Sequence, residues 1–228
     1  MKLVLILLAL CTLTYSEQIV PIPPSVDGFL LGSPTSKFQL EAFIDLMCPD
    51  SQAAWPILKK VIANVAQYGV SLRFHIFPLP FHDQAFLFAQ GANFFITNGS
   101  LSDIVNYTDL AFKYQDQYAN AVTMNLTKTQ ILNSWVDTVA KAFPTYTRDE
   151  IYNAFTNSTY NSNARTSWKL GCHLGITGTP IFKANGVTID RADEFDYAGW
   201  ISFLQKYVSI FNATELTQSH ATNETSKQ

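Results

Sequence analysis

The sequence predicts an α/β fold that carries an all-helical insertion. Two runs of alternating apolar residues, 37–45 and 70–77, have the pattern of buried strands, and the residues between them repeat at helical spacing. A strand, a helix and a strand in this order favour a right-handed parallel crossover. Helical patterns then fill about residues 83–172, and strand patterns return at 179–183 and 187–190.

The helix that follows the first strand is predicted from Pro49 to Tyr68. Pro49 suits the first helical turn, where its missing N–H leaves no hydrogen bond unmade. Pro56 lies inside the helix and predicts a kink, and Gly69 ends it. Thr147 and Glu150 form the capping box of a later helix. Further helices are predicted at 84–96, 101–118, 127–143, 147–155, 161–171 and 198–211.

Cys48 stands between the first strand and the first helix. A thiol at this place is expected to face the unpaired N–H groups of the helix and the positive end of its dipole, which stabilise a thiolate. Cys48 could instead be one more small buried residue, as free cysteines often are. We favour a reactive thiol because Pro49 directly follows it at the helix start.

A cysteine and a proline at a helix start, in the segment Cys48-Pro49-Asp50-Ser51, resemble the thioredoxin superfamily and, within it, the DsbA-like branch. Residues 28–34 resemble the lead-in of that branch, and residues 178–182 resemble its cis-proline loop and strand. The long helical stretch resembles its inserted domain. The resemblance covers about residues 26–211 and implies a thioredoxin-like fold with thiol–disulfide chemistry at Cys48.

The sequence departs from this family at Ser51, where a second cysteine would stand. A serine hydroxyl forms no disulfide, so Cys48 is left with monothiol exchange or isomerase-type chemistry. Release of a captured client then needs a thiol of the client or an external one such as glutathione. Asp50 opposes the thiolate through its charge, and Ser51 is expected to donate a hydrogen bond to it. No bound cofactor and no metal are expected, because no Cys/His spacing fits a metal site.

Two groups are expected beside Cys48. Thr179-Pro180 resembles the cis-proline pair, whose backbone faces the thiol and pairs with an extended peptide. His82 follows the second strand, and the parallel crossover brings that strand end to the same sheet edge. His82 could be a partner of the Cys48 thiolate or a substrate contact. The alternative, to which we give more weight, is that His82 and Asp83 only begin the next helix, with Asp83 as its cap.

Cys172 is the other cysteine that remains if the N-terminal segment is removed. We expect it to be a small core residue of the helix that leads into the Pro180 loop. A Cys48–Cys172 disulfide is the less favoured alternative, since cysteines do pair in oxidising compartments.

Residues 1–16 have the charged start and short apolar run of a secretory signal peptide. Residues 17–82 and 173–211 are assigned to the thioredoxin-like domain, 83–172 to the helical insertion, and 212–228 to a disordered glycosylated tail. Six Asn-x-Ser/Thr sequons, which predict exposed and glycosylated asparagines, begin at Asn98, Asn106, Asn125, Asn157, Asn212 and Asn223.

A secreted protein or a resident of an endomembrane lumen, extracellular, vacuolar or lysosomal, is therefore expected. After signal cleavage no segment is apolar and long enough for a membrane span. The net charge of −3 and the lack of a basic cluster argue against nucleic acid as a partner. The predicted partners are client protein thiols or an extended peptide. The second hypothesis for the whole chain is a thioredoxin-fold binding module for peptides or small ligands without turnover.

Overall fold

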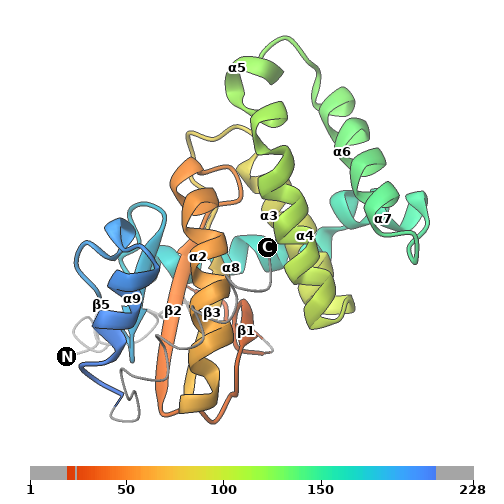
Figure 1. Ribbon diagram of the computed structural model, residues 1–228. Coiled ribbons are helices and arrows are strands. Elements are labelled where there is room, and N and C mark those ends of the chain that lie inside the picture. Colours follow the sequence, from red (N-terminus) through yellow and green to blue (C-terminus); the bar gives the residue numbers. More distant parts are fainter. Residues whose placement is uncertain (1–19, 24, 209–228) are drawn as a thin grey trace, which may run out of the picture.

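The computed structural model describes residues 20–23 and 25–208, and its centre is a mixed five-stranded sheet (Figure 1). The strand order is β1-β3-β2-β4-β5. β2 and β3 are parallel, whereas every other pair of neighbours is antiparallel. The predicted parallel crossover is therefore confirmed. The strands are β1 (Phe29–Leu31), β2 (Phe38–Ile44), β3 (Val70–Ile76), β4 (Ile181–Ala184) and β5 (Val187–Thr188).

Between β3 and β4 all regular elements are helical, and Figure 1 shows α4 to α7 standing to one side of the sheet. The α-helices are α2 (Pro49–Val65), α3 (Ala85–Asn98), α4 (Leu101–Tyr114), α5 (Asn120–Thr123), α6 (Lys128–Ala142), α7 (Arg148–Thr156), α8 (Ser158–His173) and α9 (Tyr197–Leu204). Short 3₁₀ turns are η2 (Ala66–Tyr68), η3 (Gln115–Tyr118) and η4 (Ala192–Glu194). None of the helices in the described ranges is both long and apolar enough to cross a bilayer.

Local sequence signals account for several helix ends. Pro49 is the first residue of α2, Pro56 lies inside it, and Gly69 ends the following turn with a φ of 78°. The predicted capping box of Thr147 and Glu150 is confirmed in α7. Residues 205–208 do not continue α9, so this helix is shorter than predicted, and residues 209–211 lie outside the described range.

The two faces of the sheet are covered by different helices. Side chains of Leu40, Ala42 and Ile44 belong to the large core with α2, and Phe43 belongs to a smaller cluster on the opposite face. The large core continues into the helical insertion, where Phe88 stacks on Trp135 at 4.2 Å. The insertion and the sheet therefore share one apolar core, which fixes the insertion beside the sheet.

Both faces of β3 are buried, and only Arg73 in this strand is partly exposed. Helix α8 packs against β3, and Gly32 lies against Ser71. Ser167 of α8 donates hydrogen bonds to Asp27 Oδ2 and to the carbonyl of Ile76. Ser167 thus connects α8 to the segment before β1 and to the end of β3.

His75 is the polar centre of this second face. Its Nδ1 lies 2.7 Å from Asp27 Oδ2 and its Nε2 lies 3.3 Å from Glu41 Oε2, while its ring stacks on Phe43 at 4.4 Å. Burial alone would lower the pKa of His75, but the two carboxylates outweigh it and raise this pKa. The contact with His75 is the main cause that lowers the pKa of Glu41, and the positive charges of Lys183 and Arg73 add to this effect.

We predict that His75→Gln destabilises the protein in a pH-dependent way. Because the folded-state pKa of His75 is raised, its stabilising effect is complete below the unfolded pKa of about 6.5 and is lost as the pH rises through the folded value. The free energy of unfolding in urea should fall by about 1–3 kcal/mol at pH 6. The difference from wild type should shrink towards pH 9. A difference that grows with pH would contradict this reading.

Candidate functional site

Cys48 is the N-cap residue of α2, directly beyond the carboxyl end of β2. Its backbone is extended (φ −88°, ψ 124°), and its N–H donates to the carbonyl of Asp45 at 3.0 Å. The residue is only 4% exposed. The strand-to-helix turn therefore presents the thiol at the sheet edge with little access to solvent.

The thiol of Cys48 points to the Pro180 loop rather than into the helix. Its Sγ donates a hydrogen bond to the carbonyl of Thr179 at 3.2 Å, and it makes no capping hydrogen bond to α2. The expectation that the sulfur faces the helix N–H groups is thus wrong in this state. The Thr179–Pro180 peptide bond is cis. Within the described part of the chain, the buried Oγ1 of Thr179 has no hydrogen-bond partner.

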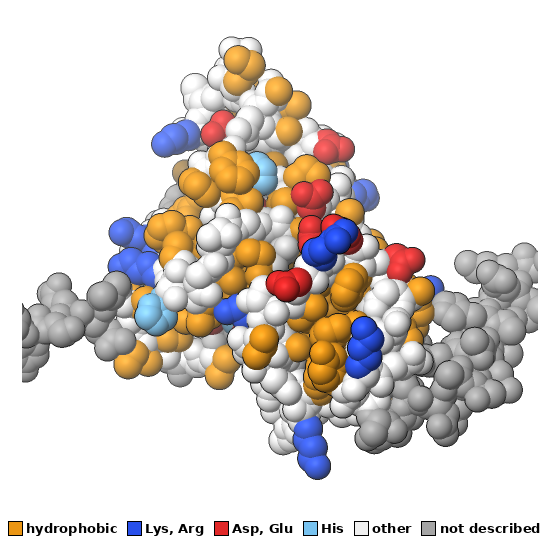
Figure 2. Space-filling model, turned by 90° about the vertical axis from the view of Figure 1, so that its left-hand side faces the viewer, with side chains coloured by type: hydrophobic (Ala, Val, Ile, Leu, Met, Phe, Trp, Pro, Cys, Tyr) orange, Lys and Arg blue, Asp and Glu red, His pale blue; other side chains and the backbone are white. Residues whose placement is uncertain are grey.

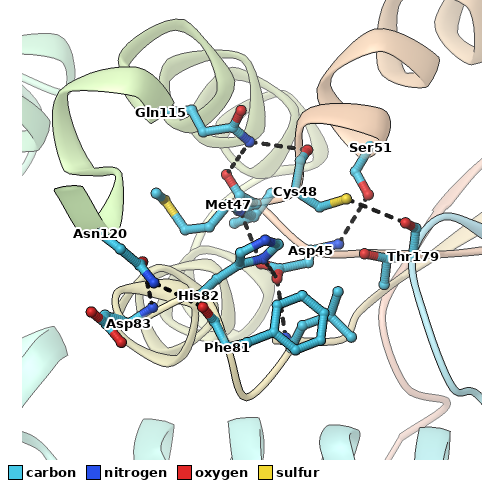
Figure 3. Close-up of polar contacts among 12 residues, drawn as sticks. Asp45, Met47, Cys48, Ser51, Phe81, His82, Asp83, Gln115, Asn120 and Thr179 are labelled. Atoms are coloured by element: carbon cyan, nitrogen blue, oxygen red, sulfur yellow. Dashed lines mark hydrogen bonds and ion pairs between the residues drawn. The ribbon is translucent and has the colours of Figure 1, made fainter. Parts of the chain in front are cut away.

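Ser51 lies one turn into α2 and is fully buried. Its Oγ accepts a hydrogen bond from the backbone N–H of Asp45 at 3.3 Å (Figure 3). The predicted hydrogen bond from Ser51 to Cys48 is not formed between these described residues, so Ser51 acts on the backbone of the turn instead. Pro49 and Asp50 are exposed in the first turn, where a substrate could meet them.

Asp45 is one of the site residues that the sequence did not lead us to predict. Its carboxylate is fully buried and accepts from the N–H of Met47 at 2.9 Å and from the N–H of Leu79 at 3.0 Å. Oδ2 also lies 2.6 Å from His82 Nδ1 (Figure 3). Burial raises the pKa of Asp45, although the hydrogen bonds from His82 and the two N–H groups act against it. The sequence did offer one signal for Asp45, because it is a polar residue at the end of a buried strand.

His82 follows β3, as expected, and lies beside Asp45 rather than bonded to Cys48. Its side chain is 20% exposed, so one edge of the ring reaches solvent. The favoured alternative, in which Asp83 caps the next helix, is wrong. α3 begins at Ala85, and its N-cap is Gln84, which makes no side-chain capping bond. The prediction that this loop returns to the Cys48 end of the sheet is confirmed.

Gln115 connects the site to the helical insertion. It lies in η3 and is buried, and its Nε2 donates to the carbonyls of Leu46 at 3.0 Å and Cys48 at 3.1 Å. These two carbonyls sit beside the turn that carries the thiol. The sequence offered no signal for this contact, because Gln115 lies 67 residues from Cys48 within an ordinary helical pattern.

Cys172 is not the core residue that the sequence predicts. It is exposed near the end of α8, and both Cys48 and Cys172 are free thiols. The helix presents Gly171 to the ring of Phe77 instead, and this close contact leaves no room for a larger side chain. The neighbouring Cys172 is turned to the surface, and burial of part of its side chain raises its pKa.

Apolar side chains are exposed on the loop that carries His82 and on the neighbouring segment around α5. Phe81 is 61% exposed, and Met124 and Val122, at or beside the end of α5, are also exposed. Asn120 holds the two segments together, because its side chain donates to the carbonyl of Phe81 and accepts from the N–H of Asp83. Figure 2 shows one face on which acidic and basic side chains are interspersed among hydrophobic ones, so no stripe of a single charge crosses it.

The sequons within the described ranges lie on the helical insertion. Asn98, Asn106, Asn125 and Asn157 are all exposed. Asn98 and Asn157 already use their side chains within the fold, since Asn98 donates to the hydroxyl of Tyr160 and Asn157 caps α8. Asn212 and Asn223 lie outside the described residues, as do the signal-type segment and the C-terminal tail.

A family model described as thioredoxin matches residues 25–205. The chain belongs to the thioredoxin family. No curated protein sequence matches it. The solved structures that it resembles include DsbA proteins, and the predicted thioredoxin-like fold with an inserted helical part is confirmed.

Three such structures illustrate the similarity. A doubly substituted variant of alpha-DsbA1 from Wolbachia pipientis has 18% identity and a TM-score of 0.63, with 83% of this chain and 93% of that chain covered. Bacillus subtilis BdbD, in its oxidised form, has 18% identity and a TM-score of 0.61, covering 79% and 92%. A protein-disulfide isomerase from Novosphingobium aromaticivorans has 18% identity and a TM-score of 0.58, covering 80% and 98%. At these identities the comparison establishes the fold.

We predict that His82→Ala destabilises the protein more at pH 7 than at pH 4. Burial raises the pKa of Asp45, and the hydrogen bond from His82 is the largest effect that lowers it. Removing His82 therefore raises the pKa of Asp45 further. A carboxyl group with a raised folded-state pKa loses stability as the pH rises above its unfolded value. The loss in the free energy of unfolding should reach about 3 kcal/mol at pH 7, as for a buried charge left without its partner.

Urea denaturation at the two pH values measures this difference. His173→Ala removes an exposed histidine at the end of α8 and is the matched control. Equal losses for His82→Ala at pH 4 and pH 7 would show that Asp45 does not depend on His82 for its charge.

Proposed function

We propose that this protein is a monothiol thiol–disulfide exchange protein of the secretory pathway, with isomerase-type activity at Cys48. The observation that carries the proposal is the Cys48 thiol at the amino end of α2, hydrogen-bonded to the carbonyl of Thr179 next to a cis proline. The family and the fold agree with this chemistry, and three names among the similar structures refer to disulfide exchange or isomerisation.

The first step is capture of a client. The Cys48 thiol loses its proton to solvent, and the thiolate attacks one sulfur of a client disulfide. One S–S bond forms between Cys48 and the client, one client S–S bond breaks, and the second client sulfur leaves as a thiolate. No net oxidation occurs, since one disulfide replaces another.

Release requires a second thiol, because Ser51 supplies none. Another thiolate of the client, or an external thiol such as glutathione, attacks the client sulfur of the mixed disulfide and returns Cys48 to its thiolate form. When the attacking sulfur belongs to the same client, the outcome is a rearranged disulfide. The long-lived mixed disulfide is therefore the distinguishing property of a site with Ser51 in place of cysteine.

The Thr179 backbone gives the site a way to recognise a peptide. Its carbonyl accepts from the Cys48 thiol in this state, and its buried hydroxyl lacks a partner within the described residues. An extended peptide that pairs with Thr179 would offer a backbone N–H to that carbonyl in place of the thiol. Binding of the peptide would then free the Cys48 thiol from Thr179 in the same step, so that it can attack. The exposed Phe81, Val122 and Met124 offer apolar contacts to such a client.

The proposed compartment rests on features of the sequence. The signal-type start and the six sequons support a secreted or lumenal glycoprotein, extracellular, vacuolar or lysosomal. Four of the asparagines are exposed on the helical insertion. A binding module without turnover is the second candidate function, and the low exposure and hydrogen-bonded state of the thiol favour it.

The experiment is a capture assay with a disulfide-bonded peptide, read by intact mass under non-reducing conditions. All variants carry Cys172→Ser, because Cys172 is an exposed free thiol that could also react. The protein with Cys48 intact should accumulate one peptide adduct, and the further change Cys48→Ser should abolish it. Ser51→Cys should lower the steady amount of adduct at least tenfold, because a cysteine at position 51 can resolve it. Ser51→Ala, which removes the hydroxyl without adding a thiol, is the matched control and should retain the adduct.

A lack of adduct at Cys48 over a range of peptides would leave the binding module as the function. Binding of the reduced peptide to both wild type and Cys48→Ser would support that alternative directly.

A further inference from the structure

A pocket lies between the loop that follows β3 and helix α8, and His82 is among its lining residues. Its volume is about 370 Å³, which is within the range of pockets that hold small ligands. Its apolar wall is formed by Pro78, Pro80, Phe86 and Trp168. The capture of a client at Cys48 and Thr179 does not use this space.

His82 takes part in both the thiol site and this pocket. Its Nδ1 is bonded to Asp45, and the residue also lines the pocket. Figure 3 shows His82 and Asp83 on the loop below Asp45 and Cys48. The pocket is therefore next to the thiol site, separated from it by the Asp45–His82 pair.

The pocket carries two opposite charges that have no partner of their own. Arg165 on α8 and Asp83 on the loop both line it, and neither side chain forms an ion pair or side-chain hydrogen bond among the described residues. Asp83 is held in place by its backbone N–H, which donates to Asn120 Oδ1 at 2.9 Å. A guanidinium and a carboxylate across an apolar wall complement a ligand that has both a carboxylate and an ammonium group.

We infer that this pocket binds the amino-acid headgroup of a small external thiol, with the carboxylate on Arg165 and the ammonium group on Asp83. The inference rests on the proposed function, in which such a thiol releases the client from Cys48. Glutathione and free cysteine both carry this zwitterionic headgroup. The pocket would raise the local concentration of the releasing thiol beside the mixed disulfide.

Trp168 supplies a direct readout of binding. It is 39% exposed at the pocket, whereas Trp55, Trp135 and Trp200 are 3%, 0% and 1% exposed. Acrylamide quenching of the intrinsic fluorescence therefore reports mainly on Trp168. The probe is S-methylglutathione, which carries the headgroup but has a methylated sulfur that forms no disulfide.

The probe should protect the fluorescence in a saturable way, with quenching reduced at least twofold. Arg165→Gln and Asp83→Asn should each weaken binding at least tenfold. Lys169→Gln removes an exposed cation that follows Trp168 on α8 but does not line the pocket, and it should leave binding unchanged. No protection up to about 10 mM probe, a range that includes weak small-ligand binding, or equal binding by Arg165→Gln and Lys169→Gln, would overturn the inference.

The outcome is independent of disulfide chemistry. Cys48→Ser should bind S-methylglutathione as wild type does, since no thiol takes part. A missing peptide adduct at Cys48 would therefore contradict the proposed function, whereas missing protection of Trp168 would contradict only the pocket.

Discussion

The buried carboxylate of Asp45 is the constraint on which the thiol site depends. One oxygen accepts from the turn that leads to Cys48, and the other accepts from the loop after β3 and from His82. Two parallel strands thus end in loops that share a single acceptor. A carboxylate in this position is expensive to bury, and three hydrogen bonds offset that cost. The loops can move apart only if these bonds are broken together.

Residues outside these two loops also hold the turn that carries Cys48. Gln115 of the helical insertion holds the carbonyls of Leu46 and Cys48, and Ser51 accepts from the N–H of Asp45. The apolar core runs without interruption from the sheet into the insertion. The insertion is consequently part of the site. A change in its packing acts on the turn that carries the thiol through Gln115.

Local pattern predicted the fold because the strands and helices here follow simple rules. Apolar alternation located β2 and β3, and proline, glycine and capping residues located the ends of α2 and α7. Cys48, Thr179 and Pro180 came from a short motif that resembles a family. Asp45 and Gln115 were not predicted because they bond to residues that lie far away in the sequence. Local sequence patterns carry no information about such contacts. The burial of His75 and the exposure of Cys172 depended likewise on where α8 packs.

Cys48 and Cys172, the two free cysteines among the described residues, allow the central claim to be tested within one molecule. Cys172 is exposed, whereas Cys48 is 4% exposed, so accessibility alone favours reaction at Cys172. The measurement is peptide mapping of the protein after brief reaction with a disulfide-bonded peptide at neutral pH. If Cys48 is the exchange thiol, the adduct forms at Cys48 before it forms at Cys172. An adduct at Cys172 alone, with Cys48 unmodified, would contradict the account.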